Sequence, residues 1–149
     1  MANQIAVGPI HHLRLTVTDV NRSREFYTGI LGFQVAVAEP PPADDPAHGL
    51  VAEALQGGVV LINAGTLIGL RPAAPQHVAA GDRFDEFRVG IDHLSFSVDS
   101  RADLERAARL LDEWGVPHGE IKDLGPFGLS VLAFRDPDNI QLELAAPLG

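Results

Sequence analysis

The sequence predicts an α+β fold in which two βαβββ modules form a curved mixed sheet around a shared cleft. The first observation behind this prediction is an internal repeat, because the stretch that begins at His12 resembles the stretch that begins at His93. The second is the order of patterns in each copy: alternating apolar and polar residues, then apolar residues at helical spacing, then three short apolar runs separated by turns. The 149 residues, 46% of them hydrophobic, suffice for one compact domain.

The repeat divides the chain into four segments. We expect an N-terminal arm over residues 1–9, a first module over 10–71, a linker over 72–90 and a second module over 91–149. The first module contains an insertion over residues 39–49. This insertion is too rich in proline and aspartate for a strand, so we expect a loop or lid there.

In the first module, the opening strand places Leu13, Leu15 and Val17 on one face and His12 and Arg14 on the other. A helix is expected from about residue 20 to residue 30, with apolar side chains at helical spacing. Three strands complete the module, over residues 34–38, 58–63 and 66–71.

The second module repeats this plan, with His93 at the start of its first strand. Ser100 and Asp103 have the spacing of a capping box at the start of a helix, and Gly115 stands where a C-terminal cap belongs. Trp114 completes the apolar stripe of this helix and is expected in the core. The remaining strands are expected over residues 117–122, 129–134 and 140–145.

Composition excludes several classes of protein. With 20 acidic and 11 basic residues, the net charge of −9 provides no dense basic surface for nucleic acid. The absence of cysteine excludes disulfides, thiolate zinc sites and cysteine nucleophiles. No apolar run is long enough for a membrane span, and the first residues lack the basic character of a signal peptide. We therefore expect a cytoplasmic protein whose chemistry depends on histidines, carboxylates and arginines.

Three of these groups converge if the two modules pack with their polar faces inward. In the last strand Glu143 lies on the face opposite Leu142 and Leu144, and the two histidines of the repeat, His12 and His93, occupy the same polar faces. Two imidazoles and one carboxylate suit a divalent ion such as Fe, Mn, Ni or Zn and leave positions open for substrate. The alternative is a metal-free pocket lined by the same polar residues.

Two arginines share the predicted inward face. Arg14 and Arg71 are candidate catalytic-site residues that would anchor an anionic group of a substrate by a forked contact. The alternative for each is an ion pair at the rim of the pocket or at an interface.

The opening and the ending of the chain resemble the vicinal oxygen chelate superfamily, which includes glyoxalases, bleomycin-resistance proteins, extradiol dioxygenases and fosfomycin-resistance transferases. The likeness spans about residues 10–146. The segments that carry it are His12-Leu13-Arg14-Leu15-Thr16-Val17, Phe26-Tyr27, Leu31-Gly32-Phe33, Phe134-Arg135-Asp136-Pro137-Asp138 and Leu142-Glu143-Leu144.

The resemblance implies that His12, His93 and Glu143 are ligands of a divalent metal. Gly69, at the position equivalent to Glu143, departs from the glyoxalase pattern, in which a further ligand is expected there. The function it implies is a metal-dependent enzyme, acting on a small oxygen-rich molecule as a dioxygenase, a lyase or a transferase. The alternative is a metal-free protein that sequesters a small molecule or an antibiotic, as bleomycin-resistance proteins do. A homodimer is expected, with no nucleic-acid or membrane partner.

Overall fold

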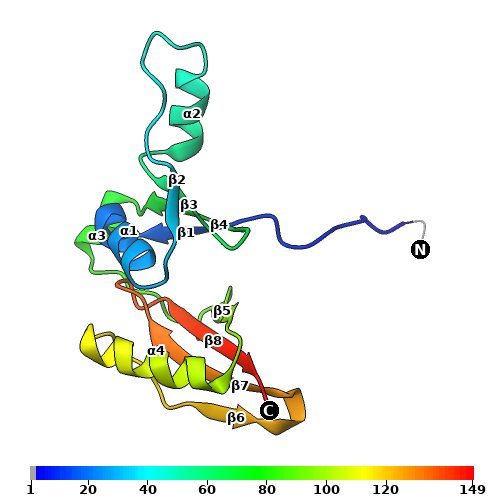
Figure 1. Ribbon diagram of the computed structural model, residues 1–149. Coiled ribbons are helices and arrows are strands. Elements are labelled where there is room, and N and C mark those ends of the chain that lie inside the picture. Colours follow the sequence, from blue (N-terminus) through cyan, green and yellow to red (C-terminus); the bar gives the residue numbers. More distant parts are fainter. Residues whose placement is uncertain (1–2) are drawn as a thin grey trace. The chain divides into compact units, whose positions relative to one another are not determined.

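The computed structural model describes residues 3–149 and divides the chain into two compact units, Met1–Asp82 and Arg83–Gly149. Each unit contains one open four-stranded mixed sheet with helices (Figure 1), so the predicted α+β class and the repeated plan are confirmed. Within the described residues, none of the helices combines the length and the apolar character that crossing a membrane requires.

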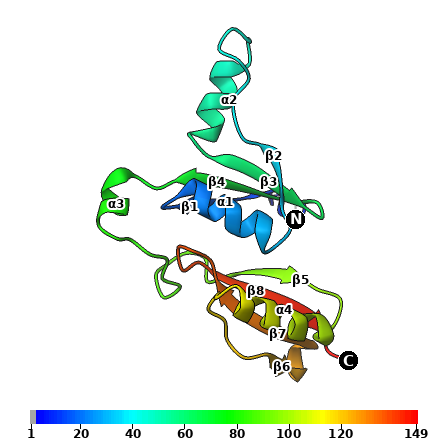
Figure 2. The same cartoon turned by 60° about the vertical axis from the view of Figure 1, so that its left-hand side comes forward.

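The first unit has a sheet in the order β1-β4-β3-β2, in which β1 is parallel to β4 and the other pairs are antiparallel. Helix α1 packs against β4 and β3, whereas α2 stands away from the sheet (Figure 2). The elements are β1 (Leu13–Val17), α1 (Val20–Gly29), β2 (Gln34–Val37), α2 (His48–Leu55), β3 (Val59–Asn63), β4 (Thr66–Pro72) and α3 (Pro75–Ala79).

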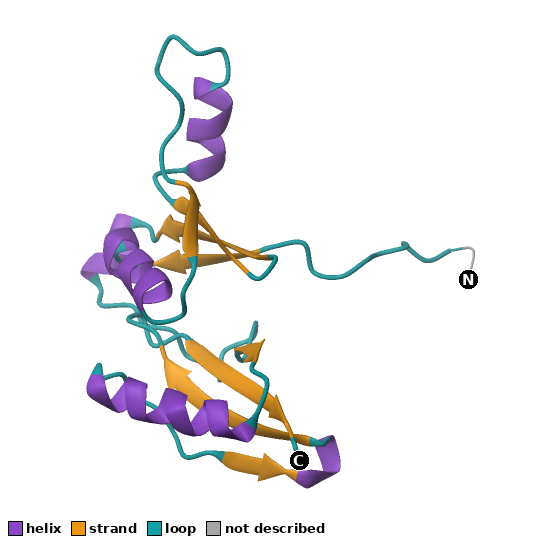
Figure 3. Cartoon of the chain, in the orientation of Figure 1, coloured by secondary structure: helices purple, strands orange, loops and turns teal. Residues whose placement is uncertain are grey.

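The second unit has the equivalent order β5-β8-β7-β6, with β5 parallel to β8. Helix α4 covers β7 and β8 (Figure 3). Its first turn carries the predicted capping box, because the Ser100 side chain accepts a hydrogen bond from the Asp103 backbone and the Asp103 carboxylate accepts one from the Ser100 backbone. The elements are β5 (Leu94–Ser97), α4 (Arg101–Glu113), β6 (Lys122–Leu124), the 3-10 turn η1 (Gly125–Phe127), β7 (Leu129–Arg135) and β8 (Gln141–Pro147).

The strand registers show that the repeat holds residue by residue. Arg14 pairs with Gly69 between β1 and β4, and Ser95 pairs with Glu143 between β5 and β8. The apolar faces pack inward in both units, with the fully buried side chains that include Tyr27, Leu61, Ile68 and Leu70 in the first and Leu104, Leu132, Phe134 and Leu142 in the second. The alternation in the sequence therefore predicted the buried faces of β1 and β8 correctly.

Two predictions about local structure were wrong, and one helix was not predicted. Trp114 is 47% exposed, because it is the C-cap residue beyond the last turn of α4. The strand expected over residues 117–122 is replaced by β6, and His118 makes only an isolated bridge with Phe134. Helix α2, which follows the Pro/Asp-rich loop, was not predicted. It ends where Gln56 and Gly57 adopt positive φ angles.

The segment that leads to His93 is anchored to the turn between β7 and β8. Arg135 donates hydrogen bonds from both Nη atoms to the two carboxylate oxygens of Glu86, at 3.0 and 2.7 Å. In addition, the Phe84 backbone donates to Asp138 O at 2.9 Å and the Asn139 side chain donates to Phe84 O. These contacts fix the start of the second unit only a few residues before β5.

The Arg135 contact makes Glu86 a source of acid-sensitive stability. Hydrogen bonding to Arg135 lowers the pKa of Glu86 from 4.5 to about 2. A carboxyl whose folded pKa is depressed stabilises the fold fully above its unfolded pKa, and this contribution disappears as the pH falls through the folded pKa. We expect Glu86→Gln to be less stable than the wild type at about pH 7, with the difference disappearing as the pH falls from about 4.5 toward about 2.

Urea denaturation of the wild type and Glu86→Gln at several pH values measures this difference. Glu120→Gln is the matched control, because Glu120 is exposed and lies outside the anchored segment. A stability gap that stays the same from neutral to strongly acidic pH would show that ionisation of Glu86 does not contribute.

Candidate metal centre

Strands β5 and β8 bring two of the three candidate ligands together. His93 immediately precedes β5, and Glu143 lies on the adjacent parallel strand β8. The distance from His93 Nε2 to Glu143 Oε1 is 3.7 Å, and the side chains are 38% and 19% exposed. A nitrogen and a carboxylate oxygen thus face one another at a solvent-accessible position.

Neighbouring polar side chains orient both groups. His93 Nδ1 donates a hydrogen bond to Asp92 Oδ1 at 2.6 Å, which leaves the lone pair of the neutral imidazole on Nε2. The Gln141 side chain donates to the same Asp92 oxygen at 2.9 Å. Ser95 Oγ donates to Glu143 Oε1 at 2.8 Å. The pair is therefore held by an outer layer of hydrogen bonds of the kind that surrounds metal ligands.

The two groups fit a shared divalent ion. Ligands bound at about 2.0–2.2 Å to one ion lie roughly 3.0–3.5 Å apart at right or tetrahedral angles. The observed separation of 3.7 Å is close to this range. The Asp92 contact leaves Nε2, the nearer ring nitrogen to Glu143, as the donor. Imidazole nitrogen with carboxylate oxygen is a donor set that Fe, Mn, Ni and Zn accept.

His12, the third candidate ligand, lies in the first unit immediately before β1. Its ring contacts the ring of His11 edge-on, with centroids 5.1 Å apart and the two Nδ1 atoms 2.9 Å apart. Within residues 3–149 the structure shows no group of three or more His, Asp or Glu side chains arranged to hold a metal. The structure thus brings His93 close to Glu143 within the second unit, and His12 belongs to the first unit.

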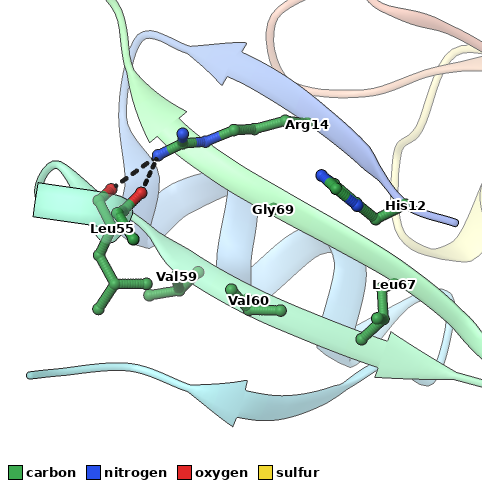
Figure 4. Close-up of a pocket in the computed structure, with 8 residues that line it drawn as sticks. His12, Arg14, Leu55, Val59, Val60, Leu67 and Gly69 are labelled. Carbon is green, nitrogen blue, oxygen red and sulfur yellow. Dashed lines mark hydrogen bonds between the residues drawn. The ribbon is translucent and has the colours of Figure 1, made fainter. Parts of the chain in front are cut away.

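His12 also lines a pocket of about 400 Å³ in the first unit, together with Arg14 and Gly69. Arg14 extends from β1 to the end of α2, where its Nη2 donates to Ala54 O and Leu55 O at 2.8 and 3.0 Å (Figure 4). Gly69 makes space for this side chain, because a Cβ atom there would lie 3.2 Å from Arg14 Cγ. The remaining lining residues are apolar: Ala54, Leu55, Val59, Val60 and Leu67.

Arg71, the second candidate substrate contact, lies on β4 opposite Thr16. It is half-buried and is not among the residues that line this pocket. The structure therefore associates Arg14, and not Arg71, with the pocket beside His12.

Two further histidines have structural partners. His48 Nδ1 donates to Pro41 O at 2.7 Å, and His118 Nδ1 donates to Gly119 O at 2.7 Å. His118 Nε2 lies 2.7 Å from the Asp112 carboxylate. The hydrogen bonds to Gly119 O and Asp112 raise the pKa of His118. Both histidines are thus engaged outside the candidate centre.

Sequence analysis missed Asp92 and Gln141, the residues that orient His93. Gln141 shares the face of β8 with Glu143, so the alternation indicated its position, whereas for Asp92 the only signal was that it is adjacent to His93. What the sequence does not contain is the contact between them, which forms only when β8 pairs with β5.

Comparison with known proteins identifies the family of this chain. The model of the Glyoxalase/Bleomycin resistance protein/Dioxygenase superfamily matches residues 9–144. The chain belongs to this superfamily. The resemblance found in the sequence is thereby confirmed.

Among the glyoxalase-superfamily relatives, YwkD of Bacillus subtilis (strain 168) is 30% identical over 135 residues, which cover 91% of this chain and 94% of that protein. The solved glyoxalase/bleomycin resistance protein/dioxygenase domain from Frankia sp. EAN1pec is 30% identical, covers 95% of this chain and 93% of its own, and has a TM-score of 0.71. The fosfomycin resistance protein FosX from Listeria monocytogenes, solved with Mn(II) and sulfate, has a TM-score of 0.67 at 17% identity, with coverage of 95% and 92%. This last likeness shows the shared fold.

Proposed function

We propose that this chain is a metal-dependent enzyme of the glyoxalase superfamily that acts on a small, oxygen-rich molecule. The observation that carries the proposal is the His93–Glu143 pair, in which Asp92 binds Nδ1 of the imidazole and Nε2 lies 3.7 Å from Glu143 Oε1. Membership of a superfamily in which FosX was solved with Mn(II) supports the same conclusion.

The proposal takes His12 as the third ligand. In the first unit His12 precedes β1 as His93 precedes β5 in the second, and the paired registers make these positions equivalent. Gly69, the equivalent of Glu143, contributes no side chain, so the proposed set is two imidazoles and one carboxylate. When bound, a divalent ion would act as a Lewis acid toward adjacent oxygens of the substrate and retain a net positive charge in this set.

The residues around the pair would keep the set ready for the ion. Asp92 holds His93 in one tautomer, and Ser95 holds the carboxylate of Glu143 in place. In the proposal Arg14 and Arg71 bind anionic groups of the substrate. We expect the active form to be a cytoplasmic homodimer, and the reaction to be that of a dioxygenase, a lyase or a transferase.

Metal titration tests this proposal. Chain prepared without nickel affinity resin and freed of metal is titrated with Mn(II), Fe(II), Ni(II) and Zn(II), and bound metal is measured by calorimetry and elemental analysis. We expect about one equivalent in the wild type and none that is tightly bound in His93→Ala. His118→Ala is the matched control and should retain the metal, because His118 is paired with Asp112.

The outcome that contradicts the proposal is a wild-type chain that binds none of the four ions, or a His93→Ala variant that binds them equally well. That result would favour the alternative, a metal-free protein that sequesters a small molecule. If metal binds, anaerobic loading with Fe(II) followed by oxygen-uptake measurements on catechols separates dioxygenase from lyase or transferase chemistry.

A further inference from the structure

We infer that the pocket of the first unit binds a small carboxylate through the guanidinium of Arg14. The inference names the substrate class of the proposed enzyme and in that respect rests on the proposed function: the substrate carries a carboxylate and a short apolar body.

The pocket has the size and lining that such a molecule requires. Its volume of about 400 Å³ falls within the range of about 300–1,000 Å³ typical of small-molecule sites. Apolar side chains such as Val60 and Leu67 form much of its wall. Among the described residues that line the pocket, Arg14 is the one with a permanent charge, and none is an acidic residue that would neutralise it. A chain with a net charge of −9 thus presents a local positive charge here.

Arg14 is held in place with part of its hydrogen-bonding capacity left over. Both of its contacts within residues 3–149 use Nη2, which donates to Ala54 O and Leu55 O at the end of α2. A guanidinium has five N–H groups, so the donors on Nε and Nη1 remain for a ligand. A guanidinium already fixed by two hydrogen bonds loses little side-chain freedom when one of its remaining N–H groups donates to a carboxylate, which favours this charge-assisted contact.

The repeat supports a carboxylate of the ligand as the partner of Arg14. In the second unit Ser95 pairs with Glu143 across β5 and β8 and donates to its carboxylate at 2.8 Å. In the first unit the equivalent pair is Arg14 and Gly69. Arg14 therefore supplies a donor at the position of Ser95, and its charged group is a stronger donor than a hydroxyl. Gly69, at the position of Glu143, supplies no carboxylate. A ligand carboxylate bound to the Arg14 guanidinium would complete the pair. A side chain at position 69 would crowd Arg14, since its Cβ would lie 3.2 Å from Arg14 Cγ.

Binding to the metal-free chain tests this inference separately from the metal site. The probe is 2-hydroxy-3-methylbutanoate, and its matched neutral comparison is the corresponding primary amide, with Kd measured by NMR titration at fixed ionic strength. We expect the carboxylate to bind at least about tenfold more tightly than the amide. Arg14→Gln should weaken carboxylate binding by about tenfold or more, and Arg14→Lys, which keeps the charge without the directed guanidinium donors, should bind with an affinity between those of the wild type and Arg14→Gln.

Control variants separate binding from folding. Arg24→Gln removes one positive charge from α1, outside the residues that line the pocket, and should bind as the wild type does. Circular dichroism and thermal unfolding check that both Arg14 variants remain folded; because Arg14→Lys retains the charge, a loss of α2 contacts alone cannot produce the graded series.

Equal binding of carboxylate and amide, wild-type affinity in Arg14→Gln, or no carboxylate binding up to about 10 mM would overturn the inference. Carboxylate binding in a chain that takes up no metal would leave the inference standing and remove the proposed metal-dependent enzyme. Metal uptake without carboxylate binding would overturn the inference and leave the proposed metal-dependent enzyme standing.

Discussion

Replacing Glu143 with glutamine is expected to lower the affinity of the chain for a divalent ion by about 100-fold or more. The variant keeps the size and the shape of the side chain, and the amide oxygen can still accept the hydrogen bond from Ser95. It removes the negative charge that offsets part of the ion's charge. Loss of an outer-layer partner of a metal ligand typically costs 10–100-fold in affinity, so loss of a charged ligand should cost at least as much.

Competition with a chelating dye at fixed pH measures this change for Mn(II) and Zn(II). Glu113→Gln is the matched control, because Glu113 is exposed at the end of α4 and the substitution removes the same charge from the second unit. Glu143→Asp should recover part of the affinity because it restores the carboxylate. If Glu143→Gln binds metal like Glu113→Gln, the carboxylate is not a ligand, and the hydrogen bond from Ser95 is its structural role.

Replacing Gly58 with alanine is expected to destabilise the first unit by about 3 kcal/mol or more. Gly58 lies between α2 and β3, and its backbone N–H donates to Leu55 O at 2.8 Å. A Cβ atom at this position would lie 1.7 Å from Leu70 O and 3.0 Å from Arg71 Cα. Since the atoms it meets belong to the backbone of β4, only a displacement of β3 from β4 can relieve the clash.

Urea denaturation followed by amide exchange in β3 and β4 measures the loss where it occurs. The control is Gly49→Ala in helix α2, where a Cβ atom meets nothing within 4 Å and alanine is expected to be neutral or stabilising by up to about 1 kcal/mol. Unchanged exchange rates at Val59–Asn63 in Gly58→Ala would mean that the two strands tolerate the extra atom and that the tight approach is not required.

Local sequence patterns were sufficient to predict the element order and the strand faces. The alternation in β1 and β5 and the helical spacing in α4 are short-range features, visible in any window of about ten residues. The repeat then aligned Gly69 with Glu143, and the registers Arg14 with Gly69 and Ser95 with Glu143 agree with that alignment. The fold class and the family resemblance therefore followed from residues that are neighbours along the chain.

Predictions were wrong where the environment overrides the local pattern. Trp114 continues the apolar spacing of α4, yet the helix ends at Glu113 and leaves the indole largely exposed. Helix α2 is short, and a helix of eight residues depends on tertiary contacts more than on its own propensity. Its last carbonyls accept hydrogen bonds from Arg14, a residue some 40 positions earlier in the chain.

What the sequence by itself determined is the plan of two βαβββ copies, the absence of thiol chemistry, and the two histidines and one carboxylate chosen as candidate ligands. The tertiary structure decided which side chains meet: Asp92 and Gln141 at His93, Arg135 at Glu86, and Arg14 over Gly69 at the end of α2. The physical reason is that periodic burial is encoded by neighbouring residues, whereas a hydrogen bond needs only a donor and an acceptor. Many side chains qualify as partners, and only the path of the folded chain selects among them.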